Sequence, residues 1–334
     1  MITPDEPHWQ SELAASYTEP QALLARLGIP PEDLAAPGTP SPFPMRVPES
    51  FVRRMRAGDP LDPLLLQVLH SPLEDLVTPG YGPDPVGDLP ARATGSALHK
   101  YHGRILVIAT GACAIHCRYC FRRHFPYGDF ALRQPGLEDV LAYLASHPEI
   151  DEVILSGGDP LSLSDERLEP LLETLGALPQ IRRLRLHTRL PVVLGQRVTV
   201  GLLNLMRRVE AAVVVVIHAN HPNELDDGIR AHLRRLVDAA ALVLNQSVLL
   251  RRVNDSTEAL SDLSHRLFDA GVVPYYLHQL DPVAGAAHFE VDDTTALGIM
   301  EGLRARLPGY LVPRLVRERP GAPFKIPLEG SICD

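Results

Sequence analysis

The sequence predicts an α/β fold in which six strand–helix units form a partial, open barrel of the (β/α)6 type. Six apolar, strand-like runs begin near Arg104, Glu152, Arg183, Ala212, Leu242 and Val273. Amphipathic helical stretches lie between them, among them residues 137–146, 164–178 and 226–239. Most successive runs start about 30 residues apart, which is the length of one strand with its crossover helix, so we expect the strands to be parallel.

Polar residues gather where these runs end. They occupy positions 113–120, 156–159, 187–189, 218–221, 245–247 and 278–281. A barrel presents its active site at the carboxyl ends of successive parallel strands, whereas a doubly wound sheet gathers polar groups at one switch point. The spread of these groups over all six units therefore favours a barrel, and six units rather than eight favour an open one.

The chain divides into three predicted parts. Residues 1–95 hold 17 of the 32 prolines and read as an extension of short helices, over 11–27, 50–57 and 63–70, followed by a Pro/Gly-rich connector at 78–90. Residues 96–285 form the barrel. Residues 286–334 form a C-terminal segment that carries Lys325 and the lone thiol Cys333, to which no role is assigned.

Composition narrows the class of protein. The 334 residues carry a formal net charge of −9, which argues against a molecule-wide nucleic-acid surface. The start of the chain lacks the pattern of a secretory signal, and no apolar run approaches the ~18 residues of a spanning helix. We therefore expect a cytoplasmic protein without a membrane or nucleic-acid partner.

Three cysteines dominate the candidate chemistry. Cys113, Cys117 and Cys120 stand in a Cys-x3-Cys-x2-Cys spacing. A structural zinc site wants four ligands and no second cysteine pair exists, while a redox disulfide needs only two thiols. Three thiolates suit a four-iron four-sulfur (4Fe-4S) cluster, whose fourth iron stays open to a small molecule.

Two further features point to bound ligands. Ser156 and Asp159 flank Gly157-Gly158, where missing side chains allow close backbone approach and Asp159 offers an acceptor for an ammonium group, although a Gly-Gly pair can also be a plain turn. Lys325 is one of only two lysines, against 30 arginines. Lysine retained where arginine is otherwise used suggests imine formation with an aldehyde cofactor, the alternative being a solvated tail residue.

Motifs along nearly the whole chain carry a family resemblance. They are residues 46–51, 62–65, 98–101, 113–127, 156–161, 245–250, 274–278, 285–289 and 309–313. In these the sequence resembles the lysine 2,3-aminomutase family of radical S-adenosylmethionine (SAM) enzymes. It is most similar to the short branch that makes beta-lysine for modification of elongation factor P.

The resemblance implies three cofactors. Cys113, Cys117 and Cys120 would bind the 4Fe-4S cluster, and residues 156–159 would contact the amino group of SAM. Lys325 matches the lysine that binds pyridoxal phosphate (PLP), and Lys100 and Arg104 are candidates for its phosphate. Arg104 has the alternative of simply flanking the first strand. Without the cysteine-bearing extension of the long free-lysine enzymes, the chain is expected to lack their zinc site.

The resemblance also implies how substrate is held. Arg122 matches the arginine that pairs with the substrate carboxylate, the alternative being charge balance beside the cluster. Asp281 and Glu318 match the two acids on the distal ammonium of lysine. Glu318 departs from the aspartate of the free-lysine enzymes, and its alternative is a surface ion pair with Arg317 or Arg319.

The resulting expectation is an isomerase that converts L-lysine to beta-lysine. Its partners would be a one-electron reductant such as flavodoxin or ferredoxin and, functionally, the lysine ligase of elongation factor P. A free-lysine or glutamate aminomutase is the alternative within the class, but an acidic substrate would want a basic residue where Asp281 stands. A non-catalytic iron–sulfur electron-transfer or sensing protein is the alternative outside it.

Overall fold

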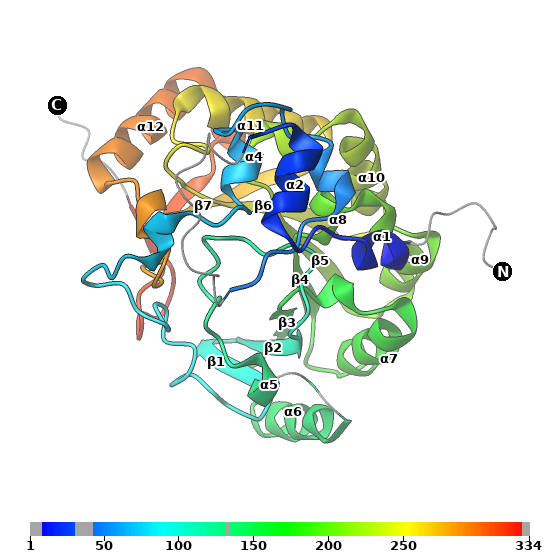
Figure 1. The fold of residues 1–334 in the computed structure, drawn as a ribbon. Coiled ribbons are helices and arrows are strands. Elements are labelled where there is room, and N and C mark those ends of the chain that lie inside the picture. Colours follow the sequence, from blue (N-terminus) through cyan, green and yellow to red (C-terminus); the bar gives the residue numbers. More distant parts are fainter. Residues whose placement is uncertain (1–8, 31–42, 131, 133, 329–334) are drawn as a thin grey trace.

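A computed structural model describes residues 9–30, 43–130, 132 and 134–328. Within them one sheet of nine strands runs in sequence order, and it is open (Figure 1). Its strands are β1 Ala97–Tyr101, β2 Arg104–Thr110, β3 Glu152–Gly157, β4 Arg183–Thr188, β5 Ala212–His218, β6 Leu242–Val248, β7 Val273–His278, β8 Arg314–Arg317 and β9 Ile326–Pro327. Strands β2 to β8 are parallel, and the edge strands β1 and β9 are antiparallel to their neighbours.

The predicted open α/β barrel is confirmed, and the six predicted strands begin where expected. A seventh parallel strand, β8, was missed. It has four residues, of which only Leu315 and Val316 are buried, so it is too short to show a periodic pattern. Cys333 lies outside the described residues.

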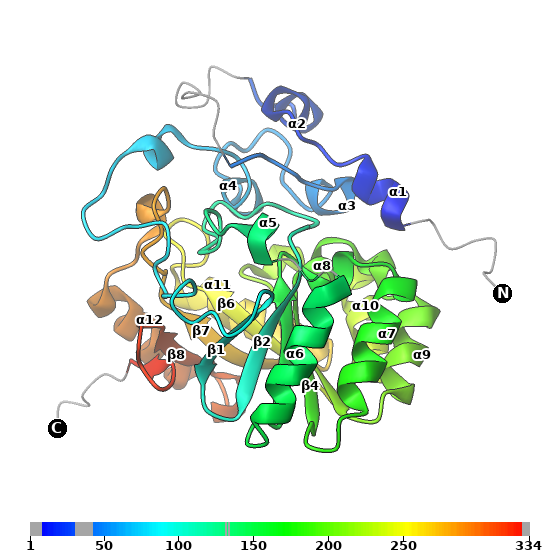
Figure 2. The same cartoon turned by 90° about the horizontal axis from the view of Figure 1, so that it is seen from below.

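Helices cover the outer face of the sheet and one of its ends (Figures 1 and 2). The α-helices are α1 Trp9–Ala14, α2 Pro20–Leu27, α3 Glu49–Val52, α4 Pro63–Leu66, α5 Tyr127–Phe130, α6 Gln134–Ser146, α7 Asp165–Gly176, α8 Leu190–Val193, α9 Val200–Arg208, α10 Asp227–Val237, α11 Thr257–Asp269 and α12 Asp293–Arg306. Short 3-10 helices occupy Pro72–Asp75, Pro160–Ser162, Gly195–Arg197, Pro222–Glu224, Ala287–Phe289 and Gly309–Leu311. No helix in the described ranges is both long and apolar enough to cross a bilayer.

The helix α10 shows why the periodic stretches fold as predicted. Asp226 caps it by accepting from the backbone N–H of Ile229 at 2.8 Å, and Ile229, Leu233 and Leu236 are buried on one face. The stretch 11–27 instead breaks into α1 and α2. Tyr17 pairs with Val47 as an isolated β-bridge, and Pro20, which has no N–H to donate, starts the second helix.

Strand register places the candidate residues on one edge. Arg104, Glu152, Arg183 and Ala212 pair in a row across β2 to β5, so these strands start level. Their carboxyl ends, and the loops that follow them, therefore share one end of the barrel. The N-terminal helices lie across this end (Figure 2), where the Ser50 hydroxyl donates to the Val193 carbonyl at 2.7 Å.

Two edges of the sheet face each other without pairing, and we call this gap the seam. On one side is β1, and on the other is the hairpin of β8 and β9, in which Arg317 pairs with Ile326. An ion pair of 3.1 Å between Lys100 Nζ and Glu318 Oε1 crosses the seam. Residues far apart in the chain therefore meet there.

Candidate active site

The cysteine loop follows β2 and is held by its own backbone. Ala114 and Ile115 are buried in the main core, and the N–H of Cys120 donates to the carbonyl of Cys117 at 3.1 Å. The three thiols are half-buried and not disulfide-bonded. The loop therefore presents three sulfurs from one short turn.

The electrostatics of these thiols suit a metal cluster. Burial, then the charges of Cys120 and Asp159, raises the pKa of Cys113 well above its usual value. Burial, then Cys117, raises the pKa of Cys120 to about 11. Cationic irons would remove this mutual repulsion, so the donor set fits an iron–sulfur cluster. In the part of the chain that the structure describes, no three His, Cys, Asp or Glu side chains converge on a single metal ion.

Gly157 and Gly158 are where β3 meets the start of the cysteine loop. The N–H of Gly158 donates to the carbonyl of Thr110 at 2.7 Å. A Cβ on Gly157 would lie 2.4 Å from that same carbonyl oxygen, and one on Gly158 would lie 2.3 Å from the carbonyl oxygen of Ala112. Glycine is therefore required here so that the two backbones can approach each other.

Asp159 is used by its own chain. Its carboxylate accepts from the Thr188 hydroxyl at 2.7 Å and from the N–H groups of Leu161, Arg189 and Leu190 at 3.0, 2.7 and 2.9 Å. Burial nevertheless raises the pKa of this carboxyl. Asp159 thus ties the end of β3 to the turn after β4.

Lys325 meets Glu318 across the β8–β9 hairpin. The ammonium of Lys325 donates to Oε2 of Glu318, while Lys100 Nζ donates to Oε1. Burial alone would raise the pKa of Glu318, but Lys325 and Lys100 outweigh it and hold the pKa at about 2. Both lysines of the sequence therefore share one carboxylate, and the surface pairing of Glu318 with neighbouring arginines is not what the structure shows.

Arg122 is buried beside the same group of charges. Its Nε donates to Oδ2 of Asp88 at 2.6 Å, and its Nη1 donates to the Ser156 hydroxyl at 3.1 Å. Oδ1 of Asp88 lies 2.5 Å from Lys100 Nζ. Asp88 was missed from the sequence because it lies in the Pro/Gly-rich connector, where no periodic pattern marks a buried position.

Asp281 is the unpaired acid of the site. No described residue hydrogen-bonds its carboxylate, and it lies near enough to Glu318 and Lys325 to feel both charges. Burial, then the negative charge of Glu318, raises the pKa of Asp281 to about 7. A ligand cation placed here would relieve that cost.

Two histidines not assigned from the sequence lie close enough to Lys325 for its charge to affect their pKa values. Burial, then Arg185 and Lys325, lowers the pKa of His187 well below its usual value, and no described group hydrogen-bonds its buried Nε2. Burial, then Lys325, lowers the pKa of His278 to about 3. A neutral, unpartnered ring nitrogen beside a lysine amine fits a polar cofactor bound to that amine.

Arg104 stands apart from this cluster of ion pairs. It begins β2, and its guanidinium lies over the ring of Tyr101 at 4.6 Å. Burial, then the negative charge of Glu318, raises the pKa of Tyr101. The structure therefore brings Arg104 to the seam through Tyr101 rather than through an ion pair.

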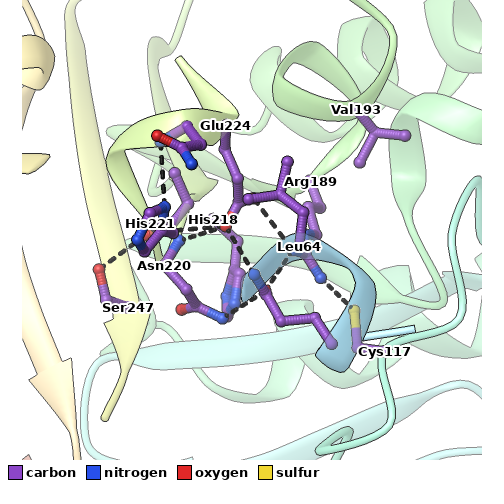
Figure 3. A network of polar contacts seen from close by, with 12 residues as sticks. Leu64, Cys117, Arg189, Val193, His218, Asn220, His221, Glu224 and Ser247 are labelled. Atoms are coloured by element: carbon purple, nitrogen blue, oxygen red, sulfur yellow. Dashed lines mark hydrogen bonds and ion pairs between the residues drawn. The ribbon is translucent and has the colours of Figure 1, made fainter. Parts of the chain in front are cut away.

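A buried polar network adjoins the cysteine loop (Figure 3). It centres on Arg189 and Glu224, which pair at 3.0 Å, and it includes His218, the last residue of β5, and Asn220, two residues further on. The sequence marks 187–189 and 218–221 as polar strand ends, but it gives them no partners.

Proteins of known name match nearly the whole chain. No family model matches the chain. The chain is 47% identical over 329 residues to the L-lysine 2,3-aminomutase of Escherichia coli (strain K12), covering 98% of this chain and 96% of that protein. Proteins of the same name from Haemophilus influenzae and Buchnera aphidicola are 43% and 38% identical, over 96% and 95% of this chain and 95% and 94% of theirs. A crystal structure of a radical SAM methyltransferase from Sphaerobacter thermophilus is 17% identical with a TM-score of 0.48, covering 66% of this chain and 68% of that one.

The L-lysine 2,3-aminomutase relatives define the protein as an enzyme of the isomerase class, which sets aside a non-catalytic iron–sulfur protein. The chain belongs to the L-lysine 2,3-aminomutase family. The predicted family resemblance is confirmed.

Proposed function

We propose that the protein is a radical SAM, PLP-dependent aminomutase that converts L-lysine to beta-lysine. The observation that carries this proposal is 47% identity over 98% of the chain to a protein named L-lysine 2,3-aminomutase. The arrangement of charges at the seam supports the same substrate.

We assign the cluster to Cys113, Cys117 and Cys120, and SAM to the backbone at Gly157-Gly158 beside them. When bound, the reduced cluster and SAM would together supply the radical chemistry needed to remove a substrate hydrogen. Since Asp159 already accepts four hydrogen bonds from its own chain, we assign it the bracing of this loop rather than a direct contact with SAM. Ser156 links the same segment to Arg122.

We assign PLP to Lys325, whose amine already lies beside the half-buried acceptor Glu318. Lys100 and Arg104 are the proposed cations for its phosphate. When bound, PLP supplies the π system that stabilises the migrating nitrogen. The chain's own work is to hold the amine, exclude water and fix the substrate at both ends.

The substrate lysine would lie between opposite charges. Arg122, held by Asp88, is the proposed partner of its carboxylate, because a planar guanidinium suits bidentate pairing. Asp281 and Glu318 are the proposed acceptors of its distal ammonium. The raised pKa of Asp281 favours this assignment over glutamate as substrate, since a second anion there would add to the repulsion.

We infer that the beta-lysine serves modification of elongation factor P, with a lysine ligase as its consumer and flavodoxin or ferredoxin as electron donor. This role is tested by the intact mass of elongation factor P in cells with and without the gene. An unchanged mass would leave free beta-lysine as the end product.

The activity is tested anaerobically with the reconstituted, reduced enzyme, SAM, PLP and each candidate amino acid. Chiral chromatography then resolves alpha from beta products. We expect beta-lysine from L-lysine and no product from glutamate. Absence of beta-lysine from protein that holds both iron and PLP would refute the proposal.

A further inference from the structure

The guanidinium of Arg189 reaches one of the three cluster cysteines. Arg189 follows β4 directly and is 7% exposed. Its Nη1 donates to Sγ of Cys117 at 2.6 Å (Figure 3). The same nitrogen donates to the Tyr119 hydroxyl at 2.7 Å. In the described part of the chain, no buried arginine or lysine side chain hydrogen-bonds Sγ of Cys113 or Cys120. Cys117 is therefore set apart from the other two thiols.

Both ends of Arg189 are fixed. Its backbone N–H donates to Asp159 at 2.7 Å, and its Nη2 donates to Gln67 Oε1 at 2.7 Å and to Glu224 Oε2 at 3.0 Å. Gln67 follows α4 of the N-terminal extension, and its Nε2 donates to Glu224 Oε1 at 3.2 Å. The guanidinium therefore has little freedom to leave the sulfur.

Glu224 balances the charge of Arg189. It is fully buried, and its Oε1 also accepts from the N–H groups of Asn220 and His221 at 2.9 and 3.1 Å. Burial alone would raise its pKa, but the charge of Arg189, with the backbone N–H of Asn220, outweighs burial and lowers the pKa. The network is thus one buried cation and one buried anion, and ligation of iron would add the negative charge of the Cys117 thiolate next to the cation.

We propose that Arg189 is a positioning residue for the iron–sulfur cluster, which orients the Cys117 thiolate and raises the reduction potential of the cluster. The proposal rests on the proposed function for the presence of that cluster. An N–H donor on a ligating sulfur stabilises the reduced, more negative state, and the effect is stronger in a buried setting. The negative charge of Glu224 has the opposite effect and destabilises the reduced cluster. The reduction potential therefore depends on the opposing charges of Arg189 and Glu224.

The test is a redox titration of the reconstituted cluster, followed by electron paramagnetic resonance, without SAM or amino acid. Arg189→Met should shift the equilibrium between reduced and oxidised cluster about tenfold toward the oxidised form. This corresponds to a fall of about 59 mV in the reduction potential for one electron. Glu224→Gln should shift it in the opposite direction. Arg189→Lys keeps the positive charge but lacks the planar guanidinium, so it should lower the reduction potential less than Arg189→Met does.

Arg197→Lys is the matched control. Arg197 is also fully buried, but it donates to the carbonyls of Leu161 and Leu163 and pairs with Asp165, away from the thiols. The reduction potential of the cluster in the Arg197→Lys variant should equal that in the unmodified protein. If Arg189→Met does not hold iron, the other two variants test the proposal. Arg189→Lys should lower the reduction potential and Glu224→Gln should raise it.

Two results would overturn the proposal: an unchanged potential in the Arg189 variants that hold iron, or an equal shift in Arg197→Lys. Because no substrate is present, failure to form beta-lysine leaves this measurement intact. A protein that takes up no iron would overturn the cluster assignment and this proposal together.

Discussion

Replacing Asp281 by asparagine tests whether the site holds an uncompensated carboxylate. The pKa of Asp281 is raised from 3.8 to about 7 by burial and by Glu318. Below pH 3.8 the group is protonated in both the folded and unfolded states and costs nothing. As the pH rises to 7 the unfolded chain releases the proton that the folded protein retains, so stability falls, and above pH 7 the full cost remains.

With its pKa raised from 3.8 to about 7, Asp281 lowers the free energy of unfolding by at most about 4 kcal/mol at pH 8. About 2–3 kcal/mol of this loss develops between pH 5 and pH 8. Asp281→Asn should therefore raise the free energy of unfolding, measured by urea titration, by that much more at pH 8 than at pH 5. The same change should raise KM for L-lysine at least about tenfold, because an amide offers the ammonium no charge.

Asp293→Asn is the control of opposite sign. Asp293 accepts from Arg317 Nη1 at 3.1 Å, and this partner lowers its pKa. Its replacement should cost about 0–1 kcal/mol at pH 8, since the pair is exposed. A gain for Asp281→Asn that is equal at both pH values, or a loss at pH 8, would refute the reasoning.

Three further changes test separate parts of the site. Lys325→Arg keeps a cation beside Glu318 but cannot form an imine, so the protein should fold and hold iron yet show neither PLP absorbance nor beta-lysine; turnover would refute the assignment. Gly158→Ala places a Cβ 2.3 Å from the carbonyl oxygen of Ala112, so urea titration should show a loss of about 1–3 kcal/mol and iron content should fall, whereas an unchanged iron content would contradict the role of the close approach. Glu74→Gln removes the buried partner of Arg118 and Arg123, at 2.5 and 2.7 Å, and should cost about 3–5 kcal/mol in the same titration; a loss below 1 kcal/mol would count against it.

Short sequence patterns predicted the long strands and the cysteine loop, but not the contacts between distant parts of the chain. The strands β2 to β7 have six or seven residues each and show as apolar or alternating runs, so they were predicted from their first residues. The cysteine spacing marked the loop after β2. β8 was too short to show such a run. The ion pair across the seam could not be predicted from a local pattern either, because Lys100 and Glu318 are 218 positions apart in the sequence.

The candidate site was predicted residue by residue, but not its partners. The role of Arg122 was predicted from its motif and stays a prediction. Asp88, which hydrogen-bonds Arg122, lies in a connector whose burial depends on tertiary packing. Arg189 was seen only as a polar strand end. Its approach to Cys117 depends on the level start of the strands and on Gln67 from the N-terminal extension, neither of which a single sequence window records.

The seam gives the protein a chemical reporter of its own. Lys100 and Lys325 are the only lysines in the sequence, and both have side chains less than a quarter exposed, at 17% and 23%. Apart from the amino terminus, every primary amine of the chain therefore belongs to the candidate site. A reagent that acylates amines would label the seam and little else, so protection from labelling, read by peptide mass, would measure occupancy of the site in the intact enzyme.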